Sequence, residues 1–341
     1  MRYRQLGHTG LFVSELCLGT MTFGGKGALY EIMGKLQQDE VNGLFARAFA
    51  AGVNFFDTAD VYSDGVSEEL LGHALKTLHG RRSDYIVATK AYGRMGPGPN
   101  DIGASRGRLM DAVVRSLERL QTDHIDLFQI HAQDLVTPTE EMMRALEDVV
   151  ARGMVRYIGC SNWQAWKIVE ANALAERRGW SPLASVQSYY SLAGRDIERE
   201  IVPMAQSRGV GILVWSPLAY GILSGKFDRE SNGPPDARRT NFDFPPVNKE
   251  LVWRIVDALR EIGTARGASP ARVAIAWTLS RPFVCSVTIG VKSLAQLDDN
   301  LAACELNLLP EEIARLDELS ALTPEYPGWM IPRQNTNRRP T

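Results

Sequence analysis

Short runs of apolar residues alternate along the chain with longer segments in which apolar residues recur at helical spacing. The short runs predict β-strands, and the longer segments predict amphipathic α-helices. The clearest helical segments cover residues 39–52, 105–121 and 138–153, and Pro138 is the expected first residue of the last of these. The expected strands cover residues 14–19, 53–58, 85–90, 125–131, 155–161, 184–188, 211–216 and 286–290.

This alternation of strand and helix is typical of a parallel sheet whose faces are covered by helices. Eight such units in 341 residues favour an α/β fold in which the sheet closes into a single (β/α)8 TIM barrel over residues 1–341. An open, doubly wound sheet would need a glycine-rich first turn to bind a dinucleotide. The first expected strand instead ends in GTMTFGGKG (19–27), which matches neither GxGxxG nor a phosphate-binding loop and is expected to be an ordinary loop.

Three segments interrupt the regular spacing of the elements. Residues 91–105 and 216–248 are expected to be long loops at the face where the barrel strands end, which is where chemistry takes place in such barrels. Their aromatic residues favour a functional role over disorder: Tyr92, Tyr220, Phe242 and Phe244. The third segment is a C-terminal loop or tail over residues 321–341, and residues 1–14 are separately expected to form an N-terminal cap.

Composition narrows the class of protein. Apolar residues make up 45% of the chain and charged residues 23%, with a net charge of −2, so no electrostatic footprint for nucleic acid is present. The four cysteines lie far apart without metal-ligand spacing, which favours free thiols in a reducing compartment and predicts no metal site. Neither a signal peptide nor a membrane-spanning run is recognisable. A cytoplasmic protein that binds neither nucleic acid nor membrane is expected.

Four polar residues end or closely follow consecutive expected strands: Asp57, Tyr62, Lys90 and His131. Because the carboxyl ends of barrel strands converge on one mouth, these side chains can meet there. A buried lysine needs a carboxylate partner, and Asp57 is the expected partner of Lys90. The ammonium should lower the pKa of the Tyr62 phenol so that it can protonate a carbonyl oxygen, which His131 would also bind. Each residue alone has a structural interpretation, whereas the four together favour catalysis.

These residues lie in motifs that resemble those of the aldo-keto reductase family. GVNFFDTADVYSDGVSEELLG (52–72) resembles the family signature that contains the catalytic aspartate and tyrosine, and VATK and DLFQIH resemble the segments with the lysine and histidine. The resemblance covers nearly the whole chain. It implies a catalytic tetrad of Asp57, Tyr62, Lys90 and His131.

The resemblance also implies a site for a nicotinamide dinucleotide. GCSNW and SVQSYYS resemble segments that bind the carboxamide, and WSPLAYGILSGK resembles the segment that stacks on the nicotinamide through Trp215 and then follows the pyrophosphate. IGVKSLAQLDDNLAA resembles the adenosine-binding turn and helix. The implied contacts are Ser161, Asn162, Gln187, Trp215, Ser216, Leu218, Ser224, Lys226, Gly290, Lys292, Gln296, Asp299 and Asn300.

One departure bears on the choice of cofactor. Shorter family members hold the 2′-phosphate of NADP with a lysine and an arginine, where this chain has Gly290 and Gln296. The longer branch, which includes the potassium-channel β subunits, uses an arginine from the loop after SGK, and Arg238 matches it, with Arg239 beside it. Since an arginine fork suits a phosphate dianion, NADPH is the expected cofactor and NADH the alternative. A solvated pair of loop arginines is the structural alternative.

The expected function is reduction of a small-molecule aldehyde or ketone to an alcohol, with hydride from NADPH and a proton from Tyr62. One alternative is an NADPH-binding regulatory subunit without catalysis, and another is a Schiff-base lyase that uses Lys90 as nucleophile. The substrate is expected to be of medium or bulky size, and the sequence does not distinguish a sugar, an aromatic aldehyde or a polycyclic ketone. The sequence also leaves the oligomeric state of the protein open. The expected apolar walls of the pocket are Phe23, Tyr92, Trp163 and Trp329.

Overall fold

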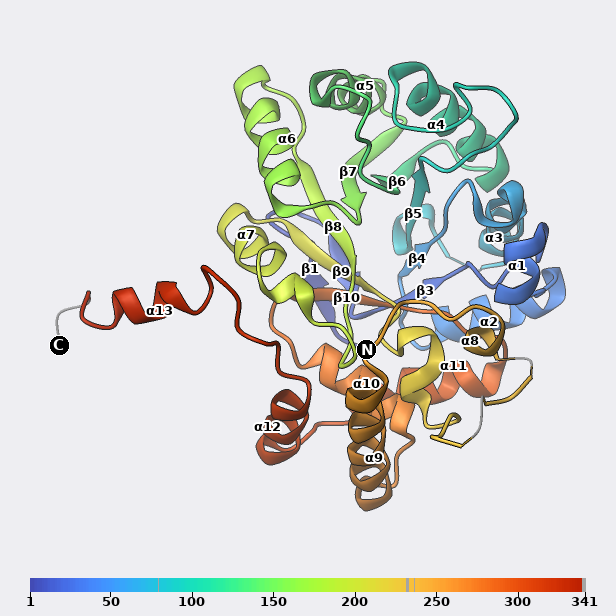
Figure 1. Ribbon diagram of the computed structural model, residues 1–341. Coiled ribbons are helices and arrows are strands. Elements are labelled where there is room, and N and C mark those ends of the chain that lie inside the picture. Colours follow the sequence, from blue (N-terminus) through green and yellow to red (C-terminus); the bar gives the residue numbers. More distant parts are fainter. Residues whose placement is uncertain (79, 231–232, 236, 339–341) are drawn as a thin grey trace.

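In the computed structural model, which describes residues 1–78, 80–230, 233–235 and 237–338, eight parallel strands close into a barrel in the order β10-β3-β4-β5-β6-β7-β8-β9 (Figure 1). The expected (β/α)8 barrel is therefore confirmed, and each expected strand is present. The strands are β3 (Leu16–Gly19), β4 (Phe55–Asp57), β5 (Ile86–Ala91), β6 (Ile125–Ile130), β7 (Val155–Ser161), β8 (Leu183–Tyr189), β9 (Gly211–Trp215) and β10 (Val284–Ile289).

Helices surround the barrel and cover its outer face (Figure 1). Their apolar faces and the outward side chains of the strands form one continuous core, which is how a parallel sheet avoids exposing an apolar face to water. These helices are α2 (Gln38–Ala50), α3 (Val66–Thr77), α4 (Arg106–Leu120), α5 (Thr139–Ala151), α6 (Ala165–Arg178), α7 (Ile201–Arg208), α9 (Lys249–Arg266), α10 (Pro270–Leu279), α11 (Leu294–Leu301) and α12 (Pro310–Leu319).

Two of the expected helix boundaries can be compared directly. Helix α5 begins at Thr139, one residue later than expected. Pro138 is therefore the N-cap residue and not the first residue of the helix. Helix α4 begins after Ser105, whose hydroxyl accepts a hydrogen bond from the Arg108 amide and so satisfies one free donor of the first turn. Part of the expected loop 216–248 is helical, as η4 (Ala219–Ser224) and α8 (Arg238–Asn241), and α1 (Ala28–Met33) follows β3.

An N-terminal hairpin closes one end of the barrel. Its strands β1 (Tyr3–Gln5) and β2 (Phe12–Ser14) pair antiparallel, and the turn between them donates from the His8 amide to the Gly209 carbonyl, just before β9. Leu6 is fully buried in a cluster with side chains from the inside of the barrel, including Phe55. The barrel is therefore plugged where its strands begin.

The C-terminal segment leaves the body of the molecule after α12. Helix α13 (Met330–Asn335) projects away from the barrel (Figure 1) and contains no buried residue. None of the helices in the described residues is long and apolar enough to cross a membrane.

Candidate active site

A cavity of about 640 Å³ lies at the end of the barrel opposite the N-terminal hairpin. Strand ends contribute its floor, because Gly19, Asp57, Ser161, Gln187 and Trp215 each lie at or near the last residue of a parallel strand and line the cavity. This is the face on which barrel enzymes carry their chemistry.

A buried ion pair lies at the cavity floor, where Asp57 lines the cavity and Lys90 does not. The Lys90 ammonium is 2.6 Å from Asp57 Oδ2 and also donates to the Thr58 carbonyl at 2.7 Å. The other Asp57 oxygen accepts hydrogen bonds from Gln129 Nε2 at 3.2 Å and Gln187 Nε2 at 3.1 Å. Since both charges are paired and hydrogen-bonded, the usual cost of burying them is offset. Gln129, from β6, is a contributor that the strand pattern alone did not single out.

Tyr62 lies directly above this ion pair. The centre of its ring is 5.2 Å from Lys90 Nζ and 5.6 Å from the centre of the His131 ring. The structure therefore brings together the four side chains that were expected to meet.

The structure does not show the expected lowering of the Tyr62 pKa by Lys90. Burial raises the pKa of the Tyr62 phenol well above its ordinary value, and Asp57 and Tyr220 raise it further, while Arg238 lowers it. Because Asp57 neutralises Lys90, the ammonium does not offset the cost of burying a phenolate. Tyr62 is therefore a neutral phenol that retains its proton at neutral pH.

His131 is also neutral. Burial, followed by the nearby charge of Lys90, lowers the pKa of its imidazole to about 3. Its backbone amide donates to the Ala91 carbonyl at 3.0 Å, and its carbonyl accepts from Asn162 Nδ2 at 3.2 Å, so β5 and the segment after β7 hold it in place. A neutral imidazole can donate one N–H to an oxygen in the cavity.

All of the residues expected to contact a dinucleotide line this one cavity. Near the tetrad, Trp215 Nε1 donates to Asn162 Oδ1 at 2.9 Å, and Asn162 Nδ2 donates to Ser161 Oγ at 3.0 Å. Asn162 and Ser216 both have positive φ angles, of 59° and 56°. Such conformations are costly for residues other than glycine and cluster at functional sites.

The far end of the cavity is built from the end of β10 and the segment after it, from α11 and from the start of α10. Ser293 caps α11, and the Lys292 amide donates to Gln296 Oε1 at 2.9 Å. Asp299 accepts from Ser269 Oγ at 2.5 Å and from Arg272 Nη2 at 2.8 Å. Cationic side chains at Lys226, Arg238 and Lys292 line the cavity, which suits a ligand that carries negative charge.

The two neighbouring arginines have different roles. Arg238 lines the cavity, with its guanidinium 5.0 Å from the centre of the Tyr220 ring. Arg239 is buried, where it donates to the carbonyls of Ala219, Phe244 and Pro245. Arg239 therefore anchors the segment after β9, and Arg238 remains available to a ligand.

The expected aromatic walls are not those that the structure places around the cavity. Phe23 and Trp163 are buried in the core, Tyr92 packs against that core, and none of the three lines the cavity. Trp329 lies on the projecting tail and is 46% exposed. Aromatic residues near a strand end can point outward into the helix layer as readily as into the mouth, so their position along the chain does not decide the matter.

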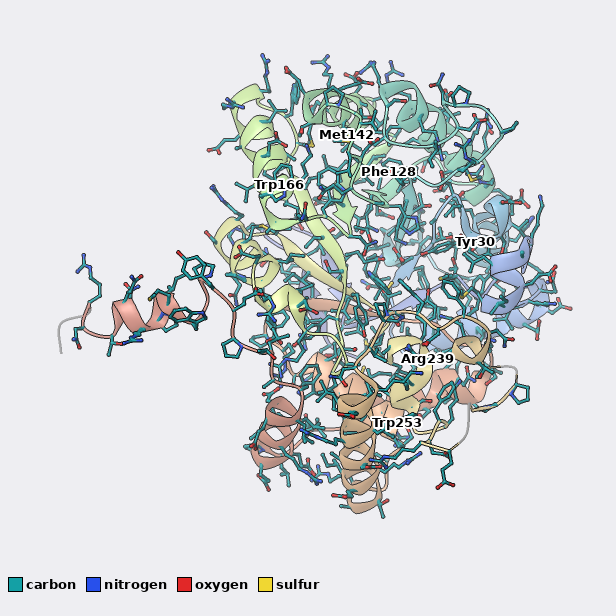
Figure 2. The ribbon with its side chains drawn as sticks, viewed as in Figure 1. Tyr30, Phe128, Met142, Trp166, Arg239 and Trp253 are labelled. Carbon is teal, nitrogen blue, oxygen red and sulfur yellow. The ribbon has the colours of Figure 1, made fainter. Side chains whose placement is uncertain are left out.

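The aromatic walls are instead Tyr30, Trp215, Tyr220 and Phe244. The Trp215 and Phe244 rings are nearly parallel, with centres 6.0 Å apart, and the Tyr30 ring centre is 6.0 Å from that of Tyr62. Figure 2 shows Tyr30 on α1 and Arg239 on α8, two elements that contact one another. Tyr30 was missed because the glycine-rich stretch before it predicts only a loop.

Comparison with known proteins agrees with this architecture. The model of the "Aldo/keto reductase family" matches residues 15–321. The chain is 37% identical to a versiconal hemiacetal acetate reductase of Aspergillus parasiticus, over 96% of this chain and 99% of that protein. It is also 37% identical to a probable voltage-gated potassium channel subunit beta of Oryza sativa subsp. japonica (96% and 98%), and 36% identical to the uncharacterized oxidoreductase YrpG of Bacillus subtilis (96% and 100%).

Proposed function

Because this chain belongs to the aldo/keto reductase family, whose members are oxidoreductases that act on carbonyl compounds, we propose that it is an NADPH-dependent reductase with Tyr62 as its proton donor. The observation that carries the proposal is the meeting of Tyr62, His131 and the buried Lys90–Asp57 pair at one end of a cavity with cationic side chains.

The protonation states of the tetrad support this role. Neutral Tyr62 and neutral His131 offer an O–H and an N–H donor to one carbonyl oxygen, and both are partly buried at the cavity wall. Donors held in a site without bulk water stabilise a developing negative charge more strongly than water does. As charge develops on the substrate oxygen, Tyr62 transfers its proton to that oxygen, while the His131 N–H continues to donate to it.

The cavity fits a bound nicotinamide dinucleotide, which would supply the hydride. Ser161, Asn162 and Gln187 would hold the carboxamide, and Trp215 would lie against the ring. Lys226, Arg238 and Lys292 would bind phosphate, and NADPH is favoured over NADH because the charge of these three cationic side chains exceeds that of the pyrophosphate, which has one negative charge on each phosphate. Holding the hydride donor and the carbonyl at reacting distance would account for much of the rate.

The substrate would be a medium or bulky aldehyde or ketone, and the product the corresponding alcohol. The aromatic walls formed by Tyr30, Tyr220 and Phe244 would cover the apolar part of the substrate. The carbonyl oxygen of the substrate would then contact Tyr62 and His131.

A Schiff-base lyase would use Lys90 as its nucleophile. Lys90 is fully buried, bonded to Asp57 and Thr58, and absent from the cavity lining, so its amine is not accessible to a substrate carbonyl. A regulatory subunit would bind NADPH without turnover, and the intact tetrad favours the reductase instead.

The test is the Tyr62→Phe variant. We expect NADPH and NADH affinities, measured by fluorescence titration, to match those of the wild type, while NADPH oxidation with a panel of aldehydes and ketones falls by roughly 10² to 10⁴-fold. Undiminished turnover by the variant would contradict the assignment of Tyr62. Cofactor binding by the wild type without turnover of any carbonyl would favour the regulatory alternative.

A further inference from the structure

A second group of buried charges lies beside the segment that connects Asp57 to Tyr62. Asp60, at the middle of this segment, forms an ion pair with Arg108 of α4, and their side chains are only 1% and 8% exposed. Arg108 also donates to the Gly93 carbonyl at 3.2 Å, in the segment after β5. One guanidinium thus connects α4 to the segments that follow the strands of Asp57 and Lys90.

Tyr62 needs an anchor because the turn that holds it is strained. Ser63 and Asp64, the two residues after it, have φ angles of 52° and 54°, which non-glycine residues rarely adopt. Strained backbone persists only where surrounding contacts fix it. On one side, Ser63 Oγ donates to the Phe23 carbonyl at 2.8 Å.

On the other side, Asp60 supplies the anchor. Its backbone amide donates to the Lys90 carbonyl at 2.9 Å, so this segment lies directly against the end of β5. Its side chain is the only charged group between Asp57 and Tyr62, and in the described structure it pairs with Arg108. Displacing Asp60 would therefore displace the turn that carries Tyr62.

The pair is incompletely bonded. Asp60 Oδ1 and Arg108 Nε are buried without a hydrogen-bond partner among the described atoms. Both residues line a cavity of about 460 Å³ between α4, the start of α5 and the segment after β5. A buried charge with an unpartnered oxygen is poorly compensated, so burial raises the pKa of Asp60 to about 6 although Arg108 opposes this.

Other charged groups face this carboxylate from the surrounding elements. Glu68 of α3 raises the Asp60 pKa and Arg119 of α4 lowers it, and these two form their own ion pair at 2.6 Å. The remaining titratable or charged residues around Asp60 are Tyr30, Tyr62, Asp101, Asp111, Arg115 and Glu141.

We propose that Asp60, held by Arg108, is a positioning residue that fixes Tyr62 for proton transfer, and that the pair makes the reaction sensitive to pH. The proposal rests on the proposed function. Ionised Asp60 holds Arg108 and the turn. When the pH falls through about 6, Asp60 takes up a proton, the ion pair is lost, and the turn loosens.

The test compares Asp60→Asn with Asp64→Asn. Asp64 lies in the same turn, but its side chain is 55% exposed and its ion pair with Lys26 is long, at 3.9 Å. Replacing this aspartate with asparagine therefore removes no buried ion pair. We expect Asp60→Asn to lower kcat roughly tenfold or more at neutral pH, because small displacements of a reacting group are costly, while KM and NADPH affinity stay within about twofold. Asp64→Asn should match the wild type.

The pH profile separates positioning from general destabilisation. Wild-type kcat should fall as the pH decreases below about 6, whereas kcat of Asp60→Asn should be low and flat across the range. Arg108→Lys, which keeps a charge, should retain more activity than Arg108→Met. A wild-type value of kcat and an unchanged acid limb in Asp60→Asn would overturn the proposal.

A second measurement does not depend on turnover. Hydrogen exchange of the amides in residues 60–66, corrected for the intrinsic pH dependence, should accelerate in Asp60→Asn and in the wild type below about pH 6. If the wild type reduces no carbonyl, the proposed function fails, and this measurement still tests the anchor. Unchanged exchange in Asp60→Asn would overturn it.

Discussion

At the scale of single residues, the site depends on which groups are charged and which are kept neutral. Lys90 and Asp57 form a buried ion pair, whereas burial raises the pKa of Tyr62 and lowers that of His131, so that both of these side chains are neutral. The same low-dielectric environment that disfavours a phenolate at Tyr62 also disfavours an imidazolium at His131. The result is two neutral donors beside one neutralised cation.

The neutral state of His131 has a consequence for stability. Its pKa is about 3 in the folded chain, below its ordinary value of 6.5, so the unfolded chain binds the proton more tightly. Stability should therefore decrease as the pH falls below about 6.5, by at most about 1.4 kcal/mol per pH unit. Urea unfolding from pH 7 to pH 4 should show a shallower acid loss for His131→Gln than for the wild type. The exposed His73→Gln variant is the control, and an identical acid loss in all three proteins would contradict the prediction.

At the scale of elements, the sequence predicts what is regular and misses what tertiary contacts create. The eight barrel strands could be predicted because each is an apolar run buried on both faces, a pattern that does not depend on the neighbours of the strand. Strands β1 and β2 have three residues each, too few for a period to be recognised. Helix α1 follows a glycine-rich stretch, so Tyr30 could not be assigned to the cavity.

The residues of the candidate site fall into the same two groups, those that the sequence predicts and those that depend on tertiary contacts. Residues at strand ends, such as Asp57 and His131, could be predicted because barrel topology places all strand ends together. Phe23 and Trp163 could not be assigned correctly, since a residue near a strand end can face either the helices or the mouth. The position of Tyr62 was anticipated, but the sign of its pKa shift was not, because that sign depends on burial and on the neutralisation of Lys90.

The segment after β9 depends on one buried side chain. Arg239 donates to three carbonyls within this segment and pairs with Asp243 at 2.7 Å. Arg239→Met leaves these carbonyls without a donor and should release Tyr220 and Phe244 from the cavity wall. We expect the Kd for NADPH, measured by fluorescence titration, to rise about tenfold, equivalent to about 1.4 kcal/mol, and proteolysis within 216–248 to accelerate.

A matched control for this change is Asp243→Asn. Asp243 is 63% exposed, so loss of its ion pair alone should change the Kd little. Equal affinity and equal proteolysis in Arg239→Met and the wild type would show that Arg239 does not hold this segment.

At the scale of the whole molecule, the two ends of the barrel have separate tasks. The hairpin of β1 and β2 fills the end where strands begin, and the cavity occupies the end where they finish. A cylinder closed at one end and open at the other allows stability and chemistry to be altered independently.

Leu6 provides the means to test this separation. It is fully buried at the closed end, among side chains that include Val13, Phe55 and Leu213, and none of these lines the cavity at the mouth. Leu6→Ala should cost about 2–5 kcal/mol of unfolding free energy, because the removed methyl groups leave a space that the rigid barrel cannot fill. Carbonyl turnover well below the unfolding temperature should equal that of the wild type. Phe12→Ala, at an exposed position on the same hairpin, should change neither quantity by much. A fall in kcat for Leu6→Ala while the protein remains folded would show that the plug and the site are coupled through the strands.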